Sequence, residues 1–155
     1  MTKKHRLCGI ECRFATDEDV WKVLTFQNLD LSERCFEVIE SFAFLTGTGS
    51  GTKMLSLPRQ LSPSFFEAEH EGIFIDSLVM HLYKQDALPQ KIDTYTEYVE
   101  SGAEMIVLLY DGVYFEVYCK NRKWLETLWR NLCQMEGVKA YKKYEDTDTR
   151  TAMYV

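Results

Sequence analysis

Residues 104–121, with the sequence EMIVLLYDGVYFEVYCKN, constrain the fold of this chain more than any other segment. Two runs rich in β-forming residues flank Asp111-Gly112. An Asp-Gly pair in this context is a strong signal for a two-residue hairpin turn, because both central positions of that turn require positive φ angles. The segment therefore predicts an antiparallel hairpin at the centre of the fold.

A two-residue turn also predicts which side chains of the hairpin share a face. Ile106 then pairs with Val117, and the other pairs follow in the same register. The predicted core face consists of Ile106, Leu108, Val113, Phe115, Val117 and Cys119. The other face is mixed, and its notable members are Tyr114, Glu116 and Tyr118. This asymmetry predicts a core on one side of the hairpin and a partly covered surface on the other.

Two further segments predict the main helices. Residues 121–137 are the clearest, since Asn121 can cap the helix, Gly137 can end it, and its leucines recur with helical spacing. Residues 16–28 form the second, with Thr16 as the N-cap before an acidic first turn. A shorter helix with glycine at its end is expected before the hairpin.

Extended segments make up most of the remaining chain, which contains no internal repeat and no long linker. Strands are predicted at residues 6–14, 72–83, 138–144 and 150–155, and as two short strands within 33–47 that break near Glu40-Ser41. The predicted fold is α+β: a single domain over residues 1–155, with a mostly antiparallel sheet, a central Asp-Gly β-hairpin and two main helices packed on it.

The chain is acidic, with a formal net charge of −6 and a pI of about 5.1. A polyanionic phosphate backbone repels such a surface, so nucleic acid is not an expected partner. The charge also disfavours an anionic membrane, and no apolar run reaches the ~18 residues that span a bilayer. The five cysteines, with no export signal before them, predict reduced thiols in a cytoplasmic protein.

Two short motifs resemble ligand sites but lack their full pattern. The glycine-rich segment TGTGSGTK, residues 46–53, does not have the Gly-Lys-Ser/Thr ending of a phosphate-binding loop, and an ordinary loop is predicted. His5, Cys8 and Cys12 are soft ligands, but the two cysteines stand about 13 Å apart on a strand, which is too far for one zinc ion. We therefore expect no metal and no cofactor, and interpret the cysteines as small buried hydrophobes.

Charged residues elsewhere have plain structural interpretations. Asp146 and Asp148 are expected in a polar turn between closing strands, and Arg150 is hypothesised to pair with one of them and hold the C-terminus. His70 stands in the acidic segment EAEHEG, which is typical of a solvated helix end. His81 lies in an apolar run and is interpreted as a core histidine with its hydrogen bonds satisfied.

Glu116 leaves two alternatives open. If the mixed face of the hairpin is uncovered, Glu116 is a solvated charge on an aromatic patch, which is the favoured interpretation. If a helix covers that face, Glu116 is a half-buried carboxylate between two phenols, and its pKa is raised.

The chain also resembles a known family in three segments: GIECRF near the start, DTYTEYVESGAEMIVLLYDGVYFEVYCKN in the middle and DTDTRTAMYV at the end. They resemble a small bacterial family of proteins of about this length, classed as a domain of unknown function. No catalytic motif is attached to that family, so the resemblance implies a bacterial cytoplasmic origin and assigns no site residues.

The favoured function is non-enzymatic protein interaction, with a partner protein or by self-association. The candidate contact residues are Tyr114, Glu116, Tyr118, Trp124 and Trp129, since aromatic side chains dominate interface energetics. The acidic charge suits an immunity or inhibitor protein that masks a basic partner. The alternative is a small ligand-binding protein or hydrolase with Glu116, His70 or His81 in a pocket.

Overall fold

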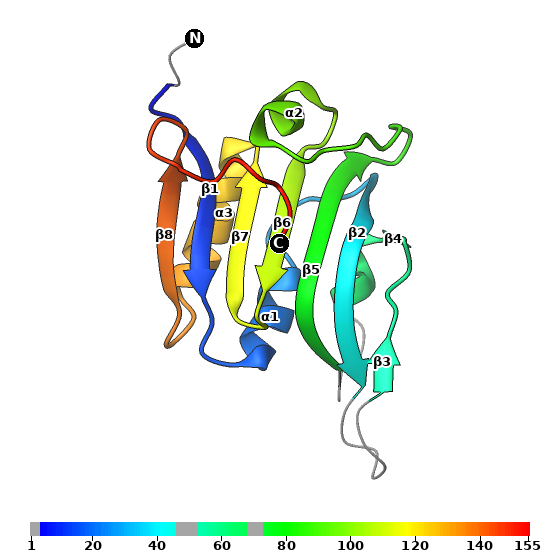
Figure 1. Cartoon of the computed structure of the whole chain (residues 1–155). Helices are drawn as coiled ribbons and strands as arrows, with labels where there is room; N and C mark the ends of the chain where they lie inside the picture. Colours follow the sequence, from blue (N-terminus) through cyan, green and yellow to red (C-terminus); the bar gives the residue numbers. More distant parts are fainter. Residues whose placement is uncertain (1–3, 46–52, 68–72) are drawn as a thin grey trace.

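A computed structural model of the chain describes residues 4–45, 53–67 and 73–155. The strands in this part of the chain form one eight-stranded sheet in the order β3-β2-β5-β6-β7-β1-β8, with β4 paired to β2 (Figure 1). Their bounds are β1 Leu7–Arg13, β2 Arg34–Leu45, β3 Lys53–Leu55, β4 Gln60–Leu61, β5 Ile73–Lys84, β6 Met105–Tyr110, β7 Tyr114–Cys119 and β8 Lys139–Tyr144. Every pairing is antiparallel, so the predicted α+β class with a mostly antiparallel sheet is confirmed.

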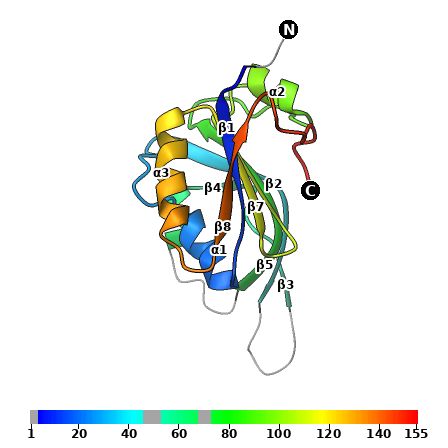
Figure 2. The ribbon, with the colours of Figure 1, turned by 90° about the vertical axis from the view of Figure 1, so that its left-hand side faces the viewer.

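Two helices cover one face of this sheet, which we call the inner face (Figure 2). Helix α1 spans Asp17–Leu24 and begins with the predicted cap, in which the Thr16 side chain accepts from the Asp19 N–H. Helix α3 spans Arg122–Cys133, and the Asn121 side chain caps it by accepting from the Trp124 N–H. Their apolar stripes, together with the 3-10 turn Pro63–Glu67, close the larger hydrophobic core over the inner face.

The opposite or outer face is covered only in its upper part. There the short helix α2, Tyr95–Glu100, and the C-terminal segment, residues 145–155, lie across the sheet (Figure 1). Backbone hydrogen bonds join the two: the Tyr95 N–H donates to Thr151 and the Met153 N–H donates to Asp93. A second, smaller hydrophobic cluster forms beneath them, with members that include Ile106, Tyr118 and Met153.

The hairpin register differs from the prediction by one residue. β6 and β7 pair Val107 with Val117 and Tyr110 with Tyr114, so three residues rather than two form the loop. Asp111 and Gly112 both have positive φ, as expected of an Asp-Gly turn. The loop is held from outside the hairpin, because the Gly112 N–H donates to Asp76 and the Val113 carbonyl accepts from Phe14. These tertiary contacts stabilise a longer loop than the local sequence favours.

A shift of one residue moves every side chain of β6 to the other face. Met105, Val107 and Leu109 therefore pack in the inner core, whereas Ile106 and Leu108 lie in the outer cluster, contrary to the prediction. The β7 residues were assigned correctly: Phe115, Val117 and Cys119 belong to the inner core, and Tyr118 lies in the outer cluster. Both faces of the hairpin turn out to be largely buried.

Two strand predictions also need correction. Residues 34–45 form one continuous strand, β2, instead of two short strands, because an irregularity between Val38 and Glu40 absorbs an extra residue without ending the pairing to β5. Residues 150–155 form no closing strand: among the described residues, a single bridge between Thr94 and Ala152 is the only β pairing of that segment. Within the described residues, no helix is long and apolar enough to cross a membrane.

We predict that Gly9 in β1 is required for stability. A Cβ at Gly9 would lie 2.5 Å from the Val117 carbonyl oxygen of the neighbouring strand, and backbone atoms cannot move aside. Gly9→Ala should lower the free energy of unfolding by about 1–3 kcal/mol in urea titrations. Gly102→Ala is the matched control, because its Cβ would meet only Gln90 Oε1 at 3.6 Å. Equal stability of the two variants would contradict this prediction.

Candidate functional site

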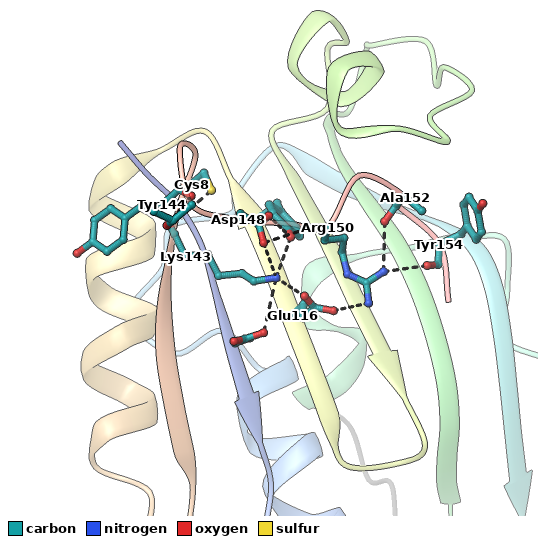
Figure 3. Close-up of polar contacts among 11 residues, drawn as sticks. Cys8, Glu116, Lys143, Tyr144, Asp148, Arg150, Ala152 and Tyr154 are labelled. Carbon is teal, nitrogen blue, oxygen red and sulfur yellow. Dashed lines mark hydrogen bonds and ion pairs between the residues drawn. The ribbon is translucent and has the colours of Figure 1, made fainter. Parts of the chain in front are cut away.

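Four charged side chains meet where the C-terminal segment crosses the outer face: Glu116, Lys143, Asp148 and Arg150 (Figure 3). We call them the charge cluster. Glu116 comes from β7 and Lys143 from β8, while Asp148 and Arg150 belong to the C-terminal segment. Three of the side chains are more than nine-tenths buried, and Arg150 is about one-quarter exposed.

Lys143 reaches β7 from the far side of a neighbouring strand. β1 lies between β7 and β8, and Gly9 pairs with Tyr118 on one side and with Lys143 on the other. The Lys143 side chain therefore extends across β1 to reach β7. Its Nζ donates to Glu116 Oε1, and to Tyr118 Oη at 2.9 Å.

The C-terminal segment completes the cluster from above. Asp148 Oδ1 lies 3.3 Å from Lys143 Nζ, and Asp148 Oδ2 accepts a 2.6 Å hydrogen bond from the Tyr118 hydroxyl. Arg150 Nη2 lies 2.7 Å from Glu116 Oε2. The Arg150 Nη1 also donates to the carbonyl oxygens of Ala152 and Tyr154, so this one guanidinium ties three points of the segment to the sheet.

The electrostatics of the cluster keep its cations charged. Burial lowers the pKa of Lys143, but the hydrogen bond to Glu116 and the negative charges of Glu116, Asp148 and Glu11 outweigh it, so that pKa lies above its ordinary value. Burial also lowers the pKa of Arg150, but the charge of Glu116 and the hydrogen bond to it outweigh burial, so this pKa too lies above its ordinary value. Burial and Asp148 raise the pKa of Tyr118. Lys143, Arg150 and Tyr118 therefore do not exchange protons near neutral pH, which disfavours a role for them in acid–base catalysis.

The favoured sequence interpretation of Glu116 is wrong. Glu116 is 3% exposed, because the upper outer face is covered by the C-terminal segment rather than left open. The hypothesis for Arg150 is wrong in its partner: the guanidinium pairs with Glu116, and only the Arg150 backbone N–H reaches Asp148. Asp146 instead pairs with His5 at 2.9 Å. No local pattern indicated these partners, since they lie far apart in the sequence.

The other predicted contact residues do not gather at one place. Tyr118 is fully buried beneath the C-terminal segment, so it offers no contact surface. Tyr114 is 36% exposed on the outer face and stacks on Tyr110, with ring centroids 5.3 Å apart. Trp124 and Trp129 lie on α3, on the inner side of the sheet, and are half-buried against the core.

A second polar site lies further along the outer face, toward β2. Glu37 of β2 and His81 of β5 are direct cross-strand partners and line a pocket of about 450 Å³. His81 is buried as predicted, but neither ring nitrogen has a hydrogen-bond partner among the described residues, so it is not the satisfied core histidine that was expected. Burial lowers the pKa of His81 to about 4. His70 falls outside the described residues.

The two cysteines of β1 do not lie together. Cys8 and Cys12 are both buried, as predicted, although they lie in different hydrophobic clusters on opposite faces of β1. Burial raises the pKa of each thiol, to about 11 for Cys8 and about 12 for Cys12. In the described part of the chain, no group of three or more His, Cys, Asp or Glu side chains is placed to hold a metal ion.

Glu116→Gln is predicted to destabilise the protein strongly. The change leaves the buried Lys143 and the partly buried Arg150 without the carboxylate between them, and breaking a buried ion pair typically costs about 3–5 kcal/mol. We expect urea unfolding to show a loss of this size. The same substitution at Glu126, whose ion pair with Arg122 is exposed on α3, should change stability by less than about 0.5 kcal/mol. Similar losses for both variants would contradict a dominant role of the charge cluster.

His81 is predicted to make stability depend on pH. Its folded pKa of about 4 lies below the ordinary value of 6.5, so between these values the unfolded chain binds a proton that the folded protein does not. Stability should therefore fall as the pH falls through this window. Between pH 7 and pH 4 the wild type should lose on the order of 2–3 kcal/mol more than His81→Phe. Glu37 and Asp93, which face His81, are present in both proteins, so parallel stability curves would refute the prediction.

Comparison with curated proteins found a similar bacterial protein. It is 32% identical over 87 residues to "Uncharacterized protein YncE" of Bacillus subtilis (strain 168). That alignment covers 56% of this chain and 55% of the relative, so the chain spans about half the length of the curated protein it matches. No solved structure matches this chain.

The match to a family is broader. Residues 59–154, which contain the hairpin and the whole charge cluster, match the family described as "Protein of unknown function (DUF2691)". The resemblance predicted from the sequence is thereby confirmed. The matched range covers more than half of this chain, and the chain therefore belongs to the DUF2691 family.

Proposed function

We propose that this protein is a non-enzymatic interaction module that binds a protein partner with a basic surface. The observation that carries the proposal is a partly exposed row of aromatic side chains along the lower outer face. We call this row the aromatic belt, and it consists of Phe42, Phe44, Phe74, Tyr110 and Tyr114.

The belt is continuous across four strands. The rings of Phe42 and Phe44 on β2 pack edge to face, with their centroids 4.9 Å apart. Phe44 is also the cross-strand partner of Phe74 on β5. The Phe74 ring lies against Gly112 of the hairpin loop, where a Cβ would come within 2.7 Å of it. Tyr110 and Tyr114, which flank that loop, complete the row. Side chains from distant parts of the sequence therefore form one surface.

Two arginine side chains lie over the tyrosine end of this surface, since the guanidinium carbons of Arg13 and Arg150 stand 5.7 Å from the ring centroids of Tyr114 and Tyr110, respectively. The C-terminal segment and α2 lie over the upper outer face, and the helices of the inner face lie behind the sheet (Figures 1 and 2). Phe42 is 41% exposed and Tyr114 is 36% exposed, and Met54, the partner of Phe44 on β3, is 61% exposed. Clustered exposed aromatics of this kind are typical of protein interfaces.

The charges favour a basic partner over a second copy of the chain. The net charge is −6, so two copies repel each other. Acidic side chains stand close to the belt: Glu40 and Glu11 on the outer face, and Asp111 in the hairpin loop, are all exposed. A partner with an apolar centre and a Lys/Arg-rich rim complements this surface, and the charges accelerate its association.

We predict that Phe42→Glu abolishes partner binding. The charge disrupts the belt at an exposed position, so the fold should be retained, as circular dichroism can verify. Tagged wild type, Phe42→Glu and Lys123→Glu are compared by affinity purification from cells of the native host, with mass spectrometry of the bound proteins. Lys123 is exposed on α3, on the other side of the sheet, and its variant is the matched control.

We expect wild type and Lys123→Glu to retain a basic protein that salt releases. The amount of this protein bound by Phe42→Glu should be at least about tenfold lower. An identical set of bound proteins for all three forms would overturn the proposal. Sedimentation of the wild type tests the partner: a dimer that Phe42→Glu dissociates would identify a second copy as the occupant and refute the basic partner.

A further inference from the structure

The pocket beside Glu37 and His81 has the features of a ligand site, and it is separate from the aromatic belt. Its floor is the outer face of β2 and β5, and its wall is residues 89–93, which follow β5. A volume of about 450 Å³ is within the range of small-molecule sites, which are usually roughly 300–1,000 Å³.

The floor contains two polar groups with incomplete hydrogen bonding. Glu37 is 6% exposed and His81 is 1% exposed. Glu37 Oε1 accepts from Arg59 Nη2 at 3.1 Å, but Glu37 Oε2 has no hydrogen-bond partner in the described part of the chain. The same is true of both His81 ring nitrogens. Buried groups of this kind cost roughly 1–3 kcal/mol each when they are left unpaired, so two adjacent ones indicate a missing partner.

The chemistry of these groups defines what that partner must offer. At neutral pH burial keeps the His81 ring uncharged, so one of its nitrogens accepts a hydrogen bond. The Glu37 carboxylate accepts as well, and Asp93 contributes a further negative charge that acts on His81. The site therefore favours a group that carries several N–H donors and a positive charge.

The chain itself provides an example of such a group. The Arg59 guanidinium already bonds Glu37 at the rim, although its side chain is 82% exposed. The ion pair of Lys91 and Asp93, at 3.4 Å, is also largely exposed. An exposed pair such as Lys91–Asp93 contributes about 0–1 kcal/mol, and a cationic ligand that displaces the exposed Arg59 side chain leaves the buried Glu37 carboxylate paired.

We propose that this pocket binds a small organic cation with a guanidinium or primary ammonium group. The cationic group donates to Glu37 Oε2 and to the acceptor nitrogen of His81, and it takes the place of the Arg59 guanidinium. The body of the ligand lies along residues 89–93, where Pro89 and Ile92 supply apolar contacts. This site does not depend on partner binding at the aromatic belt.

The proposal is tested by NMR of the histidine rings, with agmatine, methylguanidine and butylamine as cationic probes and butyramide as the neutral control. The chain has three histidines, so the spectrum of His81→Phe identifies the His81 signals. We expect a saturable shift of these signals with at least one cationic probe, and none with butyramide. No saturable shift with any cation up to about 10 mM, or an equal shift with butyramide, would overturn the proposal.

Two variants assign the binding to the named residues. Glu37→Gln keeps the volume of the side chain and removes its charge, so affinity should fall at least about tenfold. Glu40→Gln, an exposed position on the same strand, should bind like the wild type. If Glu37→Gln does not fold, Arg59→Ala replaces it: removal of the internal competitor should tighten binding. Unchanged affinity in Glu37→Gln, or weaker binding in Arg59→Ala, would refute this assignment.

Discussion

The buried contact between Lys143 and Glu116 is the interaction on which the arrangement of the outer face depends. Lys143 of β8 reaches Glu116 of β7 across β1, and the two charges then bind Asp148 and Arg150 of the C-terminal segment. Each buried charge costs several kcal/mol to desolvate, and it is tolerated only because its partners are complete. The C-terminal segment supplies these partners, so its position over the upper sheet is coupled to the charges beneath it.

This coupling divides the outer face into two parts with different properties. Above, the C-terminal segment and α2 bury Tyr118, Ile106 and Met153 in a second hydrophobic cluster. Below, no helix covers the aromatic belt within the described residues, and it stays partly exposed beside the side chains of Arg13 and Arg150. A sheet with one face packed on helices needs no second cover for stability. The lower face is thus available for the partner binding that we propose, while the upper face is committed to the fold.

The sequence predicted the elements of the fold better than their contacts. Caps at Thr16 and Asn121 placed both main helices, since these signals act within one turn of the chain. The hairpin was recognised from Asp111-Gly112, but its register was missed by one residue. The loop length is set by hydrogen bonds to Asp76 and Phe14, which are far away in the sequence. The same dependence on distant strands hid the bulge of β2 after Val38.

The candidate sites show the same division between local and tertiary information. The sequence by itself determined the antiparallel α+β class, the two main helices and the face of β7 that bears Glu116, because alternation and capping are local properties. Only the tertiary structure decided that Glu116 is buried, that Arg150 pairs with it, and that Glu37 stands beside His81. These facts depend on which strands lie side by side, and strand order is fixed by the packing of the whole sheet.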